Sequence, residues 1–147
     1  MKIVEVTERK KQFLDLLLLA DEQEDMIDRY LDKGKMYVLI DDGVKCECVI
    51  TAEGKGILEI KNIATAPKHQ GKGYGKALID FIVKEYRGHY TILQVGTGDS
   101  PTTIPFYEKF GFVRSHVIPN FLSDNYYHPI YDGGVLLVDM VYLQRPL

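Results

Sequence analysis

The feature that most constrains this chain is a glycine-rich turn, Gln70-Gly71-Lys72-Gly73-Tyr74-Gly75. It follows a strand-like run from Ile57 to Ala64 and precedes a helical run from Lys76 to Arg87. Because glycine has no Cβ, its backbone can approach a ligand closely and adopt dihedral angles that other residues avoid. The N–H groups of the first helical turn have no partner within the helix and carry partial positive charge. The turn therefore predicts a phosphate site.

The spacing of the turn excludes two other phosphate-binding motifs. A dinucleotide-binding fingerprint would place its third glycine at position 76, where this chain has Lys76. A Walker A loop would need glycine at position 70 and Ser or Thr at position 77, but the chain has Gln70 and Ala77. The missing hydroxyl is a Mg²⁺ ligand in such loops, so Mg²⁺-dependent ATP binding is not expected.

The turn resembles the acetyl-CoA signature of the GNAT (Gcn5-related) N-acetyltransferase superfamily, Gln/Arg-x-x-Gly-x-Gly/Ala, with Gln70, Gly73 and Gly75 at its defining positions. The segment 106–112 resembles a second motif of that family, in which a tyrosine at the end of a short helix precedes a Gly-Phe pair. Two motifs in the right order are more specific than either alone. With the flanking helices and strands, the resemblance spans nearly the whole chain.

The resemblance implies a GNAT fold of the α/β class, formed as a single acetyltransferase domain over residues 1–147. Such a fold has a central mixed, mostly antiparallel sheet of about six to seven strands, flanked by about four helices. A parallel, splayed strand pair borders the cofactor. The right-handed crossover rule predicts that the strands from Ile57 to Ala64 and from Tyr90 to Val95 are parallel, so these two strands are the expected pair.

Hydrophobic periodicity predicts the individual elements. Asp41-Asp42-Gly43 is a strong hairpin signal between two of the strands. The segment from Ile118 to Gly134 has no periodicity and predicts a long loop, which in a compact domain is often functional. The expected helices are 8–20, 22–33, 76–87 and 103–109, and the expected strands are 2–6, 36–40, 44–53, 57–64, 90–95, 112–117 and 135–143.

Composition limits the kinds of partner and the compartment. A chain of 147 residues is long enough for one domain with a sizeable core. The net charge of −3 and the absence of a basic block argue against nucleic-acid binding. No apolar run approaches the roughly 20 residues of a membrane span, and no signal sequence is recognisable, which points to the cytoplasm. Cys46 and Cys48 have no His or Cys at ligand spacing, so we expect buried thiols and no metal site.

The resemblance implies acetyl transfer from a thioester to an amine. An alkyl ammonium group with a pKa of about 10.4 is neutral in only about one molecule in two thousand at pH 7, so a base must remove its proton. Glu59 matches the glutamate that some family members use as this base. The alternative is that Glu59 pairs with Lys61 on an exposed strand face.

The resemblance also implies two groups that act on the thioester. A backbone N–H among Ile63, Ala64 and Thr65 would stabilise the oxyanion. Tyr107 would give its proton to the departing thiolate, because a tyrosine hydroxyl with a pKa of about 10 is protonated at pH 7. The alternative for Tyr107 is aromatic packing beside Phe106 and Phe110.

The remaining cofactor contacts are expected from the turn itself and from one loop residue. Ser100 stands seven residues before Tyr107, where many members carry an asparagine that contacts the pantetheine arm. A serine hydroxyl lacks the second donor of an amide, so this departure changes how the cofactor is positioned. The turn residues expected to contact acetyl-CoA are Gln70, Gly71, Lys72, Gly73, Tyr74, Gly75 and Lys76.

The acceptor is expected to be the primary amine of a small molecule, attacked directly in a ternary complex. A protein lysine or N-terminus is an alternative acceptor, and a non-catalytic acyl-CoA sensor is an alternative function. Carboxylates and aromatic rings in the long loop would suit a cationic amine. The same loop could instead pack on a partner subunit in a homodimer. The candidate residues are Asp124, Tyr126, Tyr127, His128 and Asp132.

Overall fold

The computed structural model describes residues 1–147 and divides them into two compact units. Unit 1 comprises Met1–Thr91 with Leu147, and unit 2 comprises Ile92–Pro146. The single domain expected over the whole chain stays a prediction. No helix has the length and apolar character needed to cross a membrane.

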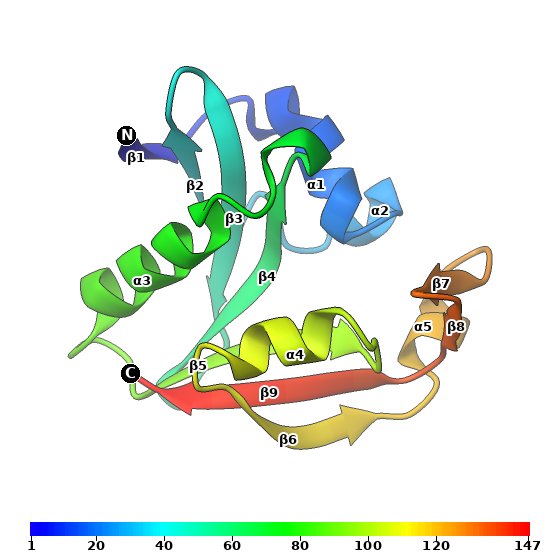
Figure 1. The fold of residues 1–147 in the computed structure, drawn as a ribbon. Helices are drawn as coiled ribbons and strands as arrows, with labels where there is room; N and C mark the ends of the chain where they lie inside the picture. The colour runs from blue at the N-terminus through cyan, green and yellow to red at the C-terminus, as the bar shows by residue number, and fades with distance from the viewer. The chain divides into compact units, whose positions relative to one another are not determined.

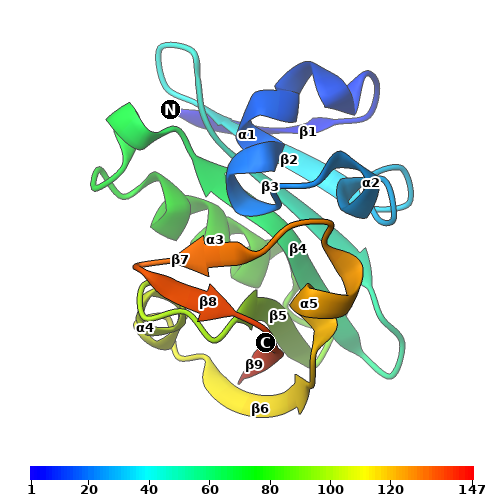
Figure 2. The same cartoon turned by 90° about the vertical axis from the view of Figure 1, so that its right-hand side faces the viewer.

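Unit 1 is a four-stranded antiparallel sheet with helices on both faces. Figure 2 shows α1 and α2 in front of the strands and α3 behind them, and both α1 and α3 pack on β3 and β4. Short 3-10 turns precede α1 and α3. The strands pair in chain order, β1 (Lys2–Val6), β2 (Lys35–Ile40), β3 (Val44–Ala52) and β4 (Ile57–Thr65). The helices are η1 (Lys10–Phe13), α1 (Leu14–Ala20), α2 (Glu24–Ile27), η2 (Pro67–His69) and α3 (Tyr74–Tyr86).

The core of unit 1 under α1 and α2 is built from side chains that alternate along the strands. Val49 on β3 and Val38 on β2 face this core, and Leu17 on α1 covers them. Each fully buried aliphatic side chain contributes about 1.5–3 kcal/mol of transfer free energy. The buried members are Leu17, Ile27, Tyr30, Leu31, Met36, Val38 and Val49.

A β-bulge interrupts the pairing of β4 with β3 at Lys61. Its neighbours Ile60 and Asn62 lie opposite consecutive residues of β3, so Lys61 has no residue opposite it. The extra residue shifts the alternation of side chains by one position. Glu59 therefore faces the same side of the sheet as Asn62, and this is the side of Val49 and the core under α1 and α2.

Unit 2 is a three-stranded antiparallel sheet with β9 in the middle. In Figure 1, α4 runs along β9. A small cluster of Leu122, Ile130 and Leu137 holds α5 against the β7–β8 hairpin. The strands are β5 (Ile92–Gly98), β6 (Val113–Ile118), β7 (Ile130–Asp132), β8 (Val135–Leu137) and β9 (Met140–Pro146), and the helices are α4 (Thr103–Glu108) and α5 (Phe121–Asn125).

Most predicted elements are confirmed within a few residues, but the second helix is wrong. Instead of spanning 22–33, α2 ends at Ile27, and turns continue to Gly34. The carbonyl groups beyond α2 are bound by a side chain from another turn, because Lys10 Nζ donates to Leu31 O at 2.9 Å and to Gly34 O at 2.6 Å. The first predicted helix also begins later than expected, as η1 followed by α1.

The unstructured loop predicted for 118–134 is also wrong, and so is the single strand predicted for 135–143. The first segment contains α5 and β7, and the second divides into β8 and β9. Gly133 and Gly134 have φ values of +56° and +77° and make the turn between β7 and β8. Three-residue strands are too short to show a period of two, which explains the missed elements.

Candidate active site

The glycine turn begins α3 in a conformation that suits an anion. Gly71 and Gly73 have φ values of +78° and +86°, and a Cβ on either would meet no atom within 4 Å. Backbone conformation therefore requires glycine here, and the space beside both residues is open. Gly73 is the N-cap of α3, and no side chain caps the helix. The first backbone bond into the helix is from Ala77 N to Gly73 O at 3.0 Å, which leaves the preceding N–H groups available for a phosphate.

Two polar side chains of the turn bind the protein itself. Gln70 Nε2 donates to Thr65 O at 3.1 Å and ties the turn to the end of β4. The Tyr74 hydroxyl donates to Asp41 at 2.8 Å, in the loop between β2 and β3. The third, Lys76, pairs with Asp80 at 2.6 Å. The predicted phosphate site therefore depends mainly on backbone N–H groups.

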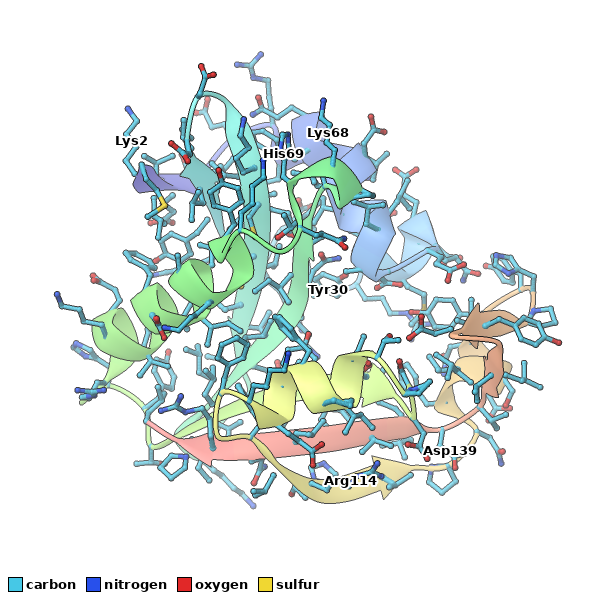
Figure 3. The ribbon with its side chains drawn as sticks, in the orientation of Figure 1. Lys2, Tyr30, Lys68, His69, Arg114 and Asp139 are labelled. Carbon is cyan, nitrogen blue, oxygen red and sulfur yellow. The ribbon has the colours of Figure 1, made fainter.

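A basic cluster beside the turn contains the predicted Lys72 and also Lys45, Lys68 and His69, which were missed in the sequence. Burial and the charges of Lys45, Lys68 and Lys72 lower the pKa of His69. Figure 3 shows Lys68 and His69 on the turn before α3. Lys45 comes from β3, far away in the sequence, so no local motif could reveal it. The cluster places positive charge near the N-terminus of α3, where an anion would bind.

The predicted oxyanion segment is the C-terminal end of β4. Ile63, Ala64 and Thr65 are consecutive there, and Ala64 lies opposite Glu47 on β3. The segment is five residues from Gln70, in the same unit. The predicted backbone donors and the glycine turn therefore lie on one continuous strand-turn-helix segment of unit 1.

Glu59 is buried and already has a partner. Glu59 is only 4% exposed, and its Oε2 atom lies 2.8 Å from Lys61 Nζ. The Lys61 ammonium also lies 3.9 Å from Glu53. The ion pair considered as an alternative in the sequence is therefore present, although the side chain is not on an exposed face.

Tyr107 and Ser100 belong to unit 2. The Tyr107 ring is buried, and its centroid lies 5.2 Å from that of Phe106 and 5.7 Å from that of Phe112. The predicted packing beside Phe106 is thus present, Phe112 is a further neighbour, and Phe110 packs on Phe106 with ring centroids 5.0 Å apart. The role of the hydroxyl as a proton donor stays a prediction.

Ser100 holds the start of α4. It is 3% exposed, and its Oγ accepts the backbone N–H groups of Thr102 and Thr103, both at 3.1 Å. The hydroxyl donates to Asp132, and Thr102 Oγ1 also donates to Asp132, at 2.5 Å. These bonds lower the pKa of the Asp132 carboxyl. Of the other candidates in this segment, Tyr127 is 84% exposed.

A buried carboxyl on β3 was also missed. Glu47 is fully buried, and neither of its carboxyl oxygens has a hydrogen-bond partner. Burial raises its pKa well above the usual range, although the nearby Ala64 backbone offsets part of this rise. The sequence signal was an acidic residue between Cys46 and Cys48 in an apolar strand. The cysteines are buried free thiols, as predicted.

An amide and a phenol continue this polar group. Asn62 Nδ2 donates to Leu17 O at 3.0 Å and to the Tyr30 hydroxyl at 3.1 Å, while its Oδ1 has no partner. The Tyr30 hydroxyl donates in turn to Asp21 at 2.9 Å. Figure 3 places Tyr30 between α2 and β4. Burial and the Asp21 carboxylate raise the pKa of Tyr30, so the phenol keeps its proton.

Comparison with known proteins gives consistent matches over the chain. Residues 32–114 match the family model of the acetyltransferase (GNAT) domain. An uncharacterized N-acetyltransferase of Bacillus subtilis, YvbK, is 33% identical over 143 residues, which are 95% of this chain and 92% of that protein. A crystal structure of a GNAT family acetyltransferase from Elizabethkingia anophelis with acetyl-CoA bound has a TM-score of 0.92 and 34% identity, covering 99% of this chain and 97% of that one.

A third relative has the same extent of similarity. The structure described as IAA acetyltransferase from Bacillus cereus has a TM-score of 0.89 and 33% identity, and covers 99% of this chain and all of the other. The predicted mixed α/β fold and the acyltransferase class are confirmed by these matches. Both motifs identified in the sequence, 70–75 and 106–112, lie inside the matched region. The chain belongs to the GNAT acetyltransferase family.

Proposed function

We propose that this protein transfers the acetyl group of acetyl-CoA to the primary amine of a small molecule, by direct attack in a ternary complex. The observation that carries the proposal is the open, uncapped start of α3 with Gly71 and Gly73 at positive φ. Its donors fit a pyrophosphate, and the similar Elizabethkingia protein has acetyl-CoA bound.

The cofactor contacts divide between backbone and charge. The N–H groups of residues 71–76 bind the pyrophosphate, and Lys45, Lys68 and Lys72 add positive charge around it. Lys76 contributes less, because its charge is paired with Asp80. Ser100 acts by fixing the start of α4, since its hydroxyl is already used by Asp132 and by two backbone N–H groups.

The chemistry uses three kinds of group on this chain. Acetyl-CoA supplies the acetyl group as a thioester. A backbone N–H among Ile63, Ala64 and Thr65 stabilises the carbonyl oxygen as negative charge develops on it. Tyr107 gives its proton to the departing thiolate. Family resemblance gives the role of base to Glu59, whose carboxylate lies beside Lys61.

The proposal also includes the compartment, the acceptor and the assembly of the protein. The protein acts in the cytoplasm, where Cys46 and Cys48 stay reduced, as both are free in the structure. Its acceptor is a small amine rather than a protein lysine or N-terminus. A homodimer is proposed as the assembly, and every residue of β6 is exposed and available for it.

Thermal unfolding with acetyl-CoA, CoA and ATP tests the cofactor. A ligand at 100 times its dissociation constant stabilises by about 2.7 kcal/mol, which raises Tm by about 5–10 °C for a chain of this size. We expect this shift with acetyl-CoA and CoA and none with ATP. Absence of a shift with both CoA compounds would refute the proposal.

The Tyr107→Phe variant separates an enzyme from a binding module. Released CoA thiol is measured with a panel of small amines and with lysine-containing peptides. Loss of the proton donor should lower kcat by about 10²-fold or more and leave the acetyl-CoA shift unchanged. Tyr131→Phe, at an exposed position in the same unit and not among the acceptor candidates, is the matched control. A wild-type protein that binds acetyl-CoA but acetylates nothing would support the sensor function instead.

A further inference from the structure

We propose that Glu47, acting through a water molecule bound between its carboxyl group and Asn62, takes the proton of the acceptor amine, in place of Glu59. The inference rests on the proposed function, because it names the base for that reaction. It is carried by the position of Glu47 on β3, by its unpartnered oxygens and by the ion pair of Glu59.

The register of β3 and β4 places Glu47 beside the oxyanion segment. Glu47 lies directly opposite Ala64, the middle residue of that segment, and neighbouring strands are about 5 Å apart. Glu59 lies five residues from Ala64 along the same strand, which is about 16 Å at about 3.3 Å per residue. Of the two carboxyl groups, Glu47 is thus the closer to the backbone donors that would hold the reacting carbonyl.

The acceptor oxygens of Glu47 and Asn62 that have no partner define a site for a water molecule. Val49 lies opposite Asn62, so Glu47 and Asn62 are diagonal neighbours on one face, within reach of each other's side chains. Both carboxyl oxygens of Glu47 and the Oδ1 of Asn62 have no partner. A water molecule donates two hydrogen bonds and is stable in an enclosed site with two to four polar partners. The Asn62 amide cannot turn to donate to Glu47, because its Nδ2 already binds Leu17 O and Tyr30.

The charges around the two carboxyl groups differ. The ammonium group of Lys61 neutralises Glu59 at 2.8 Å. No cation is paired with Glu47, so a proton is the species that can neutralise it. A carboxylate in that setting has high proton affinity, which is the property that a base for an ammonium group needs.

The groups packed around Glu47 do not compete for this proton. On the α1 and α2 side, Tyr30 is such a group, and its hydroxyl keeps its own proton in its bond to Asp21. Along β3, the adjacent residues Cys46 and Cys48 have buried thiols on the opposite face of the sheet. Burial raises the pKa of Cys46 to about 11, so this thiol is also protonated at neutral pH.

The proton steps balance over one turnover. The ammonium group gives one proton through the water to the ionised Glu47 carboxylate, and the neutral amine attacks the thioester carbonyl. A C–N bond forms, the C–S bond breaks, and the thiolate takes a proton from Tyr107. The amide nitrogen releases its second proton, which restores Tyr107 through solvent, and Glu47 returns its proton to water. The sum is one amide, one CoA thiol and one released proton.

The test compares Glu47→Gln with Glu59→Gln, using the best acceptor from the amine panel. We expect Glu47→Gln to lower kcat by about 10²–10⁴-fold at pH 7 while the thermal shift with acetyl-CoA is unchanged. Its residual rate should rise about tenfold per pH unit toward the pKa of the amine, because the neutral amine must then come from solution. Glu59→Gln should stay within about threefold of the wild type. In the infrared spectrum, the band of a buried protonated carboxyl should be present in the wild type at low pH, weaken as pH rises, and be absent in Glu47→Gln.

Each contrary outcome has a distinct meaning. If the wild type is active and the kcat of Glu47→Gln is within threefold of the wild-type kcat, this inference is overturned and the proposed function stays intact. A wild type that neither binds acetyl-CoA nor acetylates an amine overturns the proposed function, and this inference with it. If Glu47→Gln does not fold, Glu47→Asp replaces it. That variant keeps the carboxyl group but shortens its reach, so a reduced kcat with a wild-type pH profile is expected, and an unchanged kcat overturns the inference.

Discussion

Two polar groups, one in each unit, differ in whether their atoms have hydrogen-bond partners: the group in unit 2 is complete, and the group in unit 1 is incomplete. In unit 2, the Ser100 hydroxyl and the Asp132 carboxylate bind each other, and the start of α4 and Thr102 supply the remaining contacts. In unit 1, Glu47 and Asn62 leave three oxygen atoms without partners. The buried side-chain atoms that lack partners, including Nδ1 of His69, all belong to unit 1.

The difference separates polar residues that stabilise the fold from those whose atoms are available to a ligand or substrate. A completed polar group stabilises a helix start, and its removal leaves backbone N–H groups without an acceptor. An incomplete one lowers the free energy of unfolding, so its presence calls for another explanation. Four measurements would break or sharpen this comparison.

The largest expected effect on stability is from Glu47→Gln. The folded-state pKa of Glu47 is raised, so its stabilising contribution is complete below the unfolded pKa of about 4.3 and declines as pH rises toward the folded-state value. Burial of Glu47 therefore destabilises the folded protein more at pH 7 than at pH 4, because the unfolded chain releases this proton more readily. Urea unfolding should therefore show Glu47→Gln to be more stable than the wild type at pH 7 and equal to it near pH 4.

A pH-independent difference between the two proteins would contradict this account of Glu47. Glu24→Gln is a suitable control, because that carboxylate is exposed and pairs with Lys11 at the surface. It makes the same substitution at a solvent-exposed site and should alter the free energy of unfolding by less than about 1 kcal/mol.

Ser100→Ala should have the next largest effect, with the opposite sign. The substitution removes the acceptor for two backbone N–H groups at the start of α4 and one donor to Asp132. Loss of such a cap lowers the free energy of unfolding by about 1–2 kcal/mol, measured as a lower urea midpoint. Ser123→Ala, at an exposed position on α5, is the control. An unchanged midpoint would mean that the group in unit 2 does not stabilise the fold.

Asp132→Asn should have a smaller, pH-dependent effect. The folded-state pKa of Asp132 is lowered, so its contribution is present above the unfolded pKa of about 3.9 and is lost as pH falls through the folded-state value. Because the Asp132 carboxyl is only partly buried, solvent screens it, and we expect less than about 1 kcal/mol at pH 7. The difference between wild type and variant should shrink toward pH 3, and a difference that grows there would reverse the assigned sign.

The smallest effect concerns His69, the third incomplete group. Its pKa is lowered by burial and by Lys45, Lys68 and Lys72, so it is neutral at pH 7. Bound phosphates would offset the lysine charges and raise that pKa, so acetyl-CoA binding near pH 6 should take up a fraction of a proton. Calorimetry in two buffers of different ionisation enthalpy measures this uptake, which His69→Gln should abolish. Equal uptake in the variant would exclude His69 as the source.

Much of the fold followed from local sequence signals. The hairpin at Asp41-Asp42-Gly43 and the start of α3 at Gly73 depend on turn chemistry that glycine and aspartate impose on their own backbone. The segments that were wrong depend on distant partners. The turns after α2 are fixed by the Lys10 side chain, and β7 and β8 are too short for a periodic pattern.

The candidate site divides in the same way. Its glycine turn and Tyr107 were found by motifs, because both belong to continuous segments. Glu47, Lys45 and Asn62 were not found, because the register of β3 and β4 gives them their neighbours. Burial without a partner is a property of the folded chain, and no spacing in the sequence expresses it.

The bulge at Lys61 also determines how this site can change over evolutionary time. Deleting that one residue would leave Ile60 opposite Ile50 and Glu59 opposite Thr51, so both side chains would keep their faces and partners. Loss of a residue from the regularly paired stretch 62–65 would instead turn the side chains on one side of the deletion to the opposite face. Lys61 is therefore the position at which β4 can lose a residue while Glu59 and Asn62 stay on one face of the sheet.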